Sequence, residues 1–424
     1  MKVELAIIGG GPAGLSAAIR AKEAGLADVW VIERGKFLGG ILNQCIHHGF
    51  GVHIFKEELT GPEYAKRLID RAKELGVNFA MEAMVIDITQ NRELTYTTQE
   101  GLITMQAGAI ILAMGCRERP RGAVGIPGAR VAGVFAAGVA QELVNMKGHM
   151  PGKQAVILGS GDIGLIMARR LTLEGARVMG VYEIMPYSGG LKRNIVQCLN
   201  DYDIPLYLSH TVTRTVGARR LEGVYVAKVD GNLRPIMETE HFVACDTLLL
   251  SVGLIPENEL SKKIGVALSP VTGGAVVNNR LETSVPGIFS CGNVLHVHDL
   301  VDFVTLEAYE AATHAVAFIQ GEGGGAPCFD TIDESFGYAS IPIKALDGVR
   351  YTVPSIILPG SAVSYTISFR SDGVYTPGIV KVLADGEVIK VVKKRVIVPS
   401  EMVKIEFELD APVAEIAVLV EGQD

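Results

Sequence analysis

Two glycine-rich segments in this chain have the spacing of a loop that binds a dinucleotide. The pattern Gly-x-Gly-x-x-Gly occurs twice, at Gly9, Gly11 and Gly14 and again at Gly159, Gly161 and Gly164. In such a loop the first glycine permits a tight turn, the second lets the backbone approach a pyrophosphate, and the third allows close packing of helix on strand. The pyrophosphate lies at a helix N-terminus, where free N–H groups and the helix dipole favour an anion. The sequence therefore predicts two dinucleotide sites.

An acidic residue follows each glycine segment about twenty positions later, where a carboxylate can bind the adenosine ribose. These residues are Glu33 and Glu183. At the second site Glu183 would repel the 2′-phosphate of NADP and bond the free hydroxyl of NAD, so we expect NAD there. Lys192 and Arg193 lie downstream and could weaken this preference. A second site that survives only as scaffold is the alternative to NAD binding.

The segments around both glycine loops predict the same local structure. The apolar stretches Leu5–Ile8 and Ala155–Leu158 predict buried strands, and an amphipathic helix follows each loop. A second strand comes next in each copy, at Val29–Glu33 and at Arg177–Glu183. These are two βαβ units with parallel strands and right-handed crossovers. We therefore expect an α/β fold with two Rossmann-like three-layer dinucleotide-binding domains.

The order of the remaining segments predicts how the domains share the chain. Short alternating strands follow each βαβ unit, and the pattern after residue 257 indicates a return to the first domain, closed by a helix from about Thr305 to before Gly321. The first domain is therefore discontinuous, with residues 1–118 and 257–325. The second domain occupies residues 119–256.

Residues 335–424 have a different character and predict a small all-β, sandwich-like domain. Six strands are expected there, and Asp385-Gly386 between two of them is a strong hairpin signal. The glycine-rich segment from Gly321 to Pro327 should let this domain move as a separate unit. We expect it to serve assembly or partner docking without touching a cofactor, with Lys393–Arg395 and Val413–Val420 as candidate contact strands.

Composition excludes several other classes of protein. The net charge of −8 over 424 residues argues against a nucleic acid partner. The longest apolar run, of about ten residues, is half of what a membrane-spanning helix needs, so no transmembrane segment is expected. Nine histidines and six cysteines do not cluster at metal-ligand spacings, so no metal site is predicted, and the scattered cysteines fit a reducing cytoplasm.

Three further motifs carry a resemblance to a known superfamily. They are Ile110–Gly115, Leu248–Pro256 and Thr283–Asn293. In this order the motifs and the two glycine loops resemble the FAD- and NAD-linked flavoproteins with two dinucleotide-binding domains, the superfamily of thioredoxin and glutathione reductases. The resemblance covers roughly residues 1 to 325. It implies that the first site binds FAD and the second binds NAD.

The resemblance also implies which residues contact each cofactor. For FAD they are Gly9, Gly11, Pro12, Ala13, Gly14, Glu33, Arg34, Gly40, Gln44, Val85, Ala113, Gly115, Gly292 and Asn293. For NAD they are Gly159, Gly161, Ile163, Gly164, Glu183 and Gly253. Asn293 stands where the family has an aspartate that binds the ribityl chain, and an amide can still hydrogen-bond a hydroxyl.

The segment Gly39–Gly51 departs from the disulfide reductases. Their cysteine pair is missing, both after Gly39-Gly40 and in the second domain. The sequence around Gln44-Cys45 instead resembles the flavoprotein branch that accompanies anaerobic-type glycerol-3-phosphate dehydrogenases. Subunits of opine, proline and hydrogen-cyanide-forming dehydrogenases resemble it more distantly. That likeness implies a protein partner, such as a glycerol-3-phosphate dehydrogenase-like flavoprotein, although a homo-oligomer is also open.

Several residues near the expected flavin have two interpretations each. Cys45 is either a catalytic thiolate or a small residue packed beside the flavin ring. His47, His48 and His53 are either general acids or a polar loop. The last set, His296, His298, Asp299 and Asp302, could face the flavin or a substrate, but is more simply read as loop residues with one aspartate capping the helix that contains Thr305.

Together these observations predict a flavin-dependent NAD(H) oxidoreductase. A hydride would pass between nicotinamide and flavin, and electrons would pass to or from the partner. The alternatives are a free-standing NADH oxidase or peroxidase that uses Cys45, and a non-catalytic subunit that holds FAD.

Overall fold

The computed structural model describes residues 1–321, 340–358 and 364–422. Contacts divide the chain into two compact units: Met1–Cys116 with Pro256–Asp424, and Arg117–Ile255. The second unit is therefore an insertion into the first. Most of the predicted linker, residues 322–327, lies outside the described residues. No helix among the described residues is long and apolar enough to cross a membrane.

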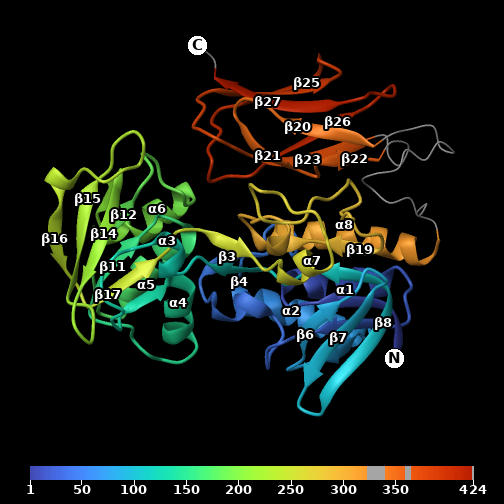
Figure 1. Cartoon of the computed structure of the whole chain (residues 1–424), viewed down its shortest axis with the longest axis horizontal. Coiled ribbons are helices and arrows are strands. Elements are labelled where there is room, and N and C mark those ends of the chain that lie inside the picture. Colours follow the sequence, from blue (N-terminus) through green and yellow to red (C-terminus); the bar gives the residue numbers. More distant parts are fainter. Residues whose placement is uncertain (322–339, 359–363, 423–424) are drawn as a thin grey trace. The chain divides into compact units, whose positions relative to one another are not determined.

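The first unit is built on a sheet with the strand order β5-β2-β1-β8-β7-β6, in which β19 also pairs with β8 (Figure 1). Five of its strands are mutually parallel: β1 (Lys2–Ile8), β2 (Val29–Ile32), β5 (Asn78–Ala80), β19 (Ile288–Ser290) and the second half of β8 (Gly101–Leu112). The first half of β8 instead forms an antiparallel meander with β7 (Glu93–Thr98) and β6 (Met84–Ile88). Continuous apolar runs such as Leu5–Ile8 are buried because both faces of a parallel sheet are covered.

Helix α1 (Pro12–Glu23) packs against both α2 (Gly61–Glu74) and α8 (Val301–Ile319). The prediction that the last helix begins near Thr305 is short by four residues, because α8 starts at Val301. The shorter elements of this unit are η1 (Gly40–Gln44), β3 (His48–Phe50), β4 (Leu59–Thr60), α7 (Glu259–Lys263) and η4 (Gly292–Val294).

The second unit repeats the parallel arrangement with the strand order β10-β17-β11-β12-β13. These strands are β10 (Val134–Ala136), β11 (Gln154–Leu158), β12 (Arg177–Glu183), β13 (Leu206–Leu208) and β17 (Thr247–Leu250). An antiparallel sheet follows, made of β14 (His210–Val216), β15 (Gly223–Lys228) and β16 (His241–Ala244). The helices are α3 (Arg121–Val124), α4 (Ala137–Asn145), α5 (Asp162–Leu173) and α6 (Lys192–Cys198), and β9 (Cys116–Glu118) and β18 (Leu254–Pro256) stand at the two unit boundaries.

Residues 341–422 form two sheets, drawn in orange and red in Figure 1, with the orders β22-β20-β27-β24-β25 and β21-β23-β26. The strands are β20 (Ile341–Ala345), β21 (Val349–Val353), β22 (Ile356–Ile357), β23 (Ser364–Ser371), β24 (Gly378–Ala384), β25 (Glu387–Lys394), β26 (Val403–Glu408) and β27 (Ile416–Gly422). The predicted hairpin is present, with positive φ at Asp385 (48°) and Gly386 (87°) between β24 and β25. The six predicted strands become eight, because β20 was missed and one predicted strand divides into β21 and β22.

The prediction that Val413–Val420 is a contact strand of this domain is wrong. β27 lies inside its sheet between β20 and β24, and its alternating residues Ile416, Val418 and Val420 are buried in the core between the two sheets. β25, by contrast, is an edge strand and is largely exposed.

The β domain also contacts the dinucleotide-binding part of its own unit. The Ser355 amide donates to the Val277 carbonyl (3.1 Å), and the Leu358 amide donates to Oδ1 of Asn279 (2.8 Å). The guanidinium of Arg370, on β23, pairs with Asp299. These contacts argue against a freely tethered module.

Candidate functional site

The first glycine loop closes tightly against its sheet but stays open at its centre. A Cβ added to Gly9 would lie 2.4 Å from the Ala113 carbonyl oxygen, and one added to Gly14 would lie 1.8 Å from the Gly9 oxygen. A Cβ added to Gly11 would meet no described heavy atom within 4 Å. The first and third glycines are therefore sterically required, and the second leaves room for a ligand.

The N-terminus of α1 offers its free N–H groups to that space. No described side chain caps α1 at Gly11, whereas α2 carries a complete capping box between Thr60 and Glu63. An uncapped helix start inside the protein needs a partner for its N–H groups, and an anion is the natural one. The cradle therefore fits the pyrophosphate of FAD.

The Glu33 carboxylate is held in place by hydrogen bonds from backbone amides, one of them in the first glycine loop. Its Oε2 accepts from the Gly10 amide (2.7 Å), and its Oε1 accepts from the Gly35 amide (2.6 Å). The Glu33 carbonyl accepts from the Ala83 amide (2.9 Å), which brings the buried Val85 segment to the same end of the site. Arg34 is largely exposed and lies 3.8 Å from Glu257.

The other predicted FAD residues converge on the start of α1 from separate segments. A Cβ on Gly40 would lie 3.1 Å from the Gly11 Cα, and one on Gly292 would lie 2.9 Å from the Ala13 Cβ. The Ala113 amide donates to the Ile8 carbonyl (2.9 Å) at the end of β8, one residue before Met114 and Gly115. Gln44 is buried at the end of η1.

The second glycine loop repeats part of this geometry in the second unit, but its middle glycine is less open, because a Cβ on Gly161 would lie 2.9 Å from the Ser251 hydroxyl oxygen. A Cβ on Gly159 would lie 2.1 Å from the Ser251 carbonyl oxygen, and the Gly164 amide donates to the Ser251 hydroxyl (3.2 Å). No described side chain caps α5 at Gly161, one residue before the first turn that contains Ile163. A Cβ on Gly253 would again meet no described atom within 4 Å.

Glu183 repeats the role of Glu33. Its Oε2 accepts from the amide (2.8 Å) and the hydroxyl (2.6 Å) of Ser160, and its Oε1 accepts from the Met185 amide (2.9 Å). The side chain is 8% exposed, so the carboxylate stays at the end of β12. Lys192 and Arg193 are exposed at the start of α6.

Cys45 follows η1, and its thiol donates to the Ile41 carbonyl (3.3 Å). Burial raises the pKa of this thiol to about 12. The group is therefore protonated at neutral pH, which favours packing over thiolate chemistry. The five cysteines in the described residues form no disulfide with one another, and Cys328 lies outside them.

Asp302 has a role that sequence reasoning missed. Its carboxylate accepts from the amides of Gly51 (3.0 Å), His53 (3.1 Å) and Ile54 (2.9 Å). The prediction that it caps α8 is wrong, since Leu300 holds the cap position and no described side chain bonds there. The aspartate instead holds the histidine-containing loop in place, with His53 stacked near Phe303 at 5.3 Å between ring centroids.

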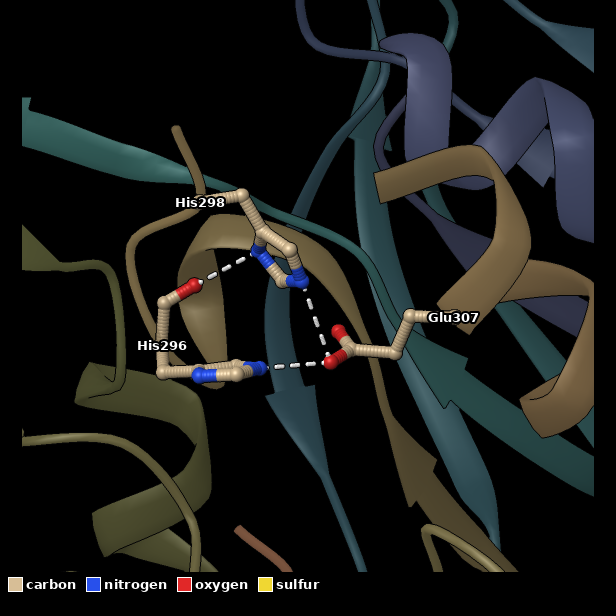
Figure 2. A group of neighbouring side chains, drawn as sticks. All are labelled: His296, His298 and Glu307. Atoms are coloured by element: carbon tan, nitrogen blue, oxygen red, sulfur yellow. Dashed lines mark hydrogen bonds and ion pairs between the residues drawn. The ribbon is translucent and has the colours of Figure 1, made fainter. Parts of the chain in front are cut away.

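His296 and His298 converge on Glu307 of α8, a residue that sequence reasoning did not single out (Figure 2). Oε2 of Glu307 lies 2.6 Å from Nε2 of His296 and 3.2 Å from Nε2 of His298. The sequence did carry a signal for Glu307: it is a charged residue on the same face of the predicted helix as Val304 and Ala311, which are buried. Asp299 does not cap α8 either, because it pairs with Arg370 and accepts from the Met402 amide (2.7 Å).

The ligand atoms of these three residues lie within 4.8 Å of one another, a spacing that a metal ion could use. Two of the separations are hydrogen-bond lengths, however, and tetrahedral ligands about 2.0–2.1 Å from zinc lie roughly 3.3 Å apart. The contacts therefore indicate hydrogen bonding within the group.

Two sheets with parallel strands, each with an uncapped helix at a glycine loop and a fixed carboxylate beside it, have the architecture of two dinucleotide-binding domains. The chain belongs to the pyridine nucleotide-disulphide oxidoreductase family, whose model matches residues 3–317.

The relatives fall among reductases and subunits of oxidising complexes. Hydrogen cyanide synthase subunit HcnB of Pseudomonas protegens is 28% identical over 63% of this chain, and the match spans 60% of that protein's length. Thioredoxin reductase of Listeria monocytogenes is 26% identical over 69% of this chain and 85% of its own. Among solved structures, T. acidophilum thioredoxin reductase matches with a TM-score of 0.60 and 24% identity over 74% of this chain and 98% of its own, a likeness of fold.

Proposed function

We propose that this enzyme exchanges a hydride between NAD(H) and FAD and passes electrons to or from a partner flavoprotein, without a protein disulfide as relay. When bound, the flavin supplies the chemistry of two-electron transfer. The residues of the chain bind and orient the two dinucleotides. We assign the predicted FAD residues and the predicted NAD residues to these roles.

The observation that carries this proposal is the equivalence of Glu33 and Glu183. Each carboxylate bonds the amide of the second residue of its glycine loop and an amide two residues after itself. A site that survived only as scaffold would not need a buried carboxylate held this way. The equivalence therefore supports a working nicotinamide site.

The cysteines support a partner in place of a disulfide. The five described cysteines form no disulfide with one another, and their burial and scatter fit no dithiol relay. HcnB is named as a subunit, which favours work within a complex. The resemblance around Gln44-Cys45 favours a glycerol-3-phosphate dehydrogenase-like partner, and described cysteines without a disulfide among them fit a cytoplasmic location.

We assign partner contact to the β domain, residues 335–424, through its edge strand β25. Val388, Ile389 and Val391 are between 40% and 49% exposed on this strand, which also carries Lys390 and Lys393. An exposed edge with both apolar and basic residues suits an acidic partner strand.

The test is anaerobic reduction of the purified yellow protein. NADH should bleach the flavin band, NADPH should do so much less efficiently, and no disulfide reductase activity should be measurable. Co-purification from the native host should recover a second flavoprotein, and Lys390→Glu with Lys393→Glu should release it. A flavin that NADH leaves oxidised would refute the proposal.

A further inference from the structure

Glu307 joins the late FAD motif to two buried histidines. Its Oε1 accepts from the Gly292 amide (2.6 Å), and its Oε2 faces the Nε2 atoms of both His296 and His298 (Figure 2). The His298 amide donates to Oδ1 of Asn293 (3.0 Å). The three side chains therefore contact one another, and Glu307 and the His298 backbone contact the two residues assigned to FAD.

The hydrogen bonds fix how many protons the group holds. Nδ1 of His298 lies 3.0 Å from the His296 carbonyl oxygen, which can only accept, so this nitrogen carries a proton. One proton lies in the hydrogen bond between Oε2 of Glu307 and Nε2 of His296, and the 3.2 Å contact of Oε2 with Nε2 of His298 needs another, because a bare ring nitrogen would repel the carboxylate. Two neutral imidazoles and one carboxylate hold only two protons in total, whereas this pattern needs three. The group therefore holds one extra proton.

The extra proton belongs to His298. Burial works to raise the pKa of Glu307, but attraction to His298 and His296 outweighs it and holds this pKa well below its ordinary value. Burial lowers the pKa of His296, and its Nδ1 has no hydrogen-bond partner among the described residues, as suits a neutral ring. His298 is the ring with both nitrogens facing acceptors, so its contacts call for a proton on each nitrogen.

Other ionisable groups face the cluster from the neighbouring elements. Arg370 of β23 lies near His296 and donates to the Val297 carbonyl (3.1 Å), and the Tyr351 ring of β21 lies 6.4 Å from the His296 ring. Burial raises the pKa of the Cys291 thiol, and the charge of Glu307 raises it further. Burial also raises the pKa of Glu310 of α8; Lys404 lowers this pKa, and Glu307 raises it.

We propose that His296, His298 and Glu307 are positioning residues that hold one proton beside the late FAD motif, and that the charge on His298 raises the reduction potential of the bound flavin. The proposal rests on the assignment of Gly292 and Asn293 to the FAD site. With the proton the group is neutral, and without it the group is an anion that opposes the addition of electrons nearby. Removal of one unit charge from a buried site changes such an equilibrium on the order of tenfold.

The first test reads the protons directly. In the wild-type holoprotein with ¹⁵N-labelled histidine, the His298 signals at pH 7 should show both nitrogens protonated, and those of His296 only one. His298→Gln assigns the resonances. A neutral His298, or a metal ion bound stoichiometrically by the purified protein, would overturn the proposal.

The second test compares flavin midpoint potentials in three variants. His298→Gln keeps an N–H donor for Glu307 but carries no charge, so reduced flavin should lose affinity relative to oxidised flavin on the order of tenfold, which is about 30 mV for a two-electron couple. Glu307→Gln removes the anion and should leave the potential unchanged or raise it. His314→Gln, on the same helix but beside Arg20 and Thr313, is the matched control and should change nothing.

The opposite signs separate charge from mere structure, since a purely structural role would loosen the flavin in both variants of the cluster. Equal shifts in His298→Gln and Glu307→Gln would overturn the proposal. So would an unchanged potential in His298→Gln. In either case NADH could still bleach the flavin, so the proposed function would stand.

Discussion

Arg370 is the residue through which the β domain holds the loop that follows the late FAD motif. Its guanidinium pairs with Asp299 and donates to the carbonyls of Val297 (3.1 Å) and Pro399 (3.2 Å). The two side chains are 15% and 13% exposed. Replacing Arg370 with alanine should therefore leave a mostly buried carboxylate without its cation and remove a donor from two carbonyls.

The loss in free energy of unfolding depends on the hydrogen bonds that Asp299 retains without Arg370. Breaking a buried ion pair by removing one partner costs about 3–5 kcal/mol. Asp299 still accepts from the Met402 amide, and some water reaches the pair, so we expect the lower end, about 3 kcal/mol. Arg370→Lys keeps the charge but loses the planar fork, and should cost about half as much. In a double-mutant cycle with Asp299→Asn, the two losses should not add.

The assay is urea unfolding followed by circular dichroism and by flavin fluorescence. A chain of several units need not unfold in one step, so the comparison concerns the transition that releases FAD. Arg370→Ala should lower its midpoint and speed loss of FAD. A change below about 0.5 kcal/mol, as for an ordinary surface substitution, would refute this account of the contact.

Three further predictions test other parts of the structure. Glu183→Ala should reduce the preference for NADH over NADPH by roughly tenfold, because the variant loses both a hydrogen bond to the ribose and the charge that repels the 2′-phosphate. The measurement compares rates of flavin reduction by the two cofactors, and equal rates in the wild type would contradict the assignment. Cys45→Ser should leave NADH-to-dye activity unchanged, since the thiol is protonated, and selective loss of peroxide turnover would favour the peroxidase alternative. The contribution of His296 to the free energy of unfolding should fall as pH drops from 7 toward 5, because its pKa is lowered in the folded state and the unfolded chain then binds a proton that the folded ring does not; the difference in slope between the wild type and His296→Gln measures this contribution, while that of Glu307, whose pKa is also lowered, is lost only below its ordinary value of 4.5.

The parts of the site that could be predicted from the sequence are those that depend on residues close together in the chain. Gly9 and Gly159 are required by contacts at a neighbouring strand end and Gly14 by contact with Gly9, and the loops and strands around them follow from short apolar runs. Glu33 and Glu183 come at a fixed distance because one helix and one strand of ordinary length separate them from the loop. Such features need no knowledge of distant contacts.

The parts that were missed depend on partners far away in the chain. An aspartate next to a predicted helix start suggests a cap, because capping is the commonest local use of that residue. Asp302 instead bonds three amides of residues 51–54, and Asp299 bonds Arg370 and Met402. Glu307 was overlooked for the same reason, since its partners come from a loop whose course the helix pattern does not reveal.

The two glycine loops also differ in a way that suits two different ligands. In the first loop the Gly10 carbonyl accepts from the Gly39 amide (2.8 Å), a backbone contact. In the second, polar side chains make the corresponding links: the Ser160 hydroxyl accepts from the Gly189 amide (2.8 Å), and Asp162 accepts from the Leu191 amide (2.8 Å) and from Asn194 (2.6 Å). Side-chain links of this kind can break and re-form without moving a strand. If the proposed function is right, we therefore expect residues 188–194 to adjust when a nicotinamide dinucleotide binds and leaves, while the backbone links of the first loop suit a flavin that stays bound.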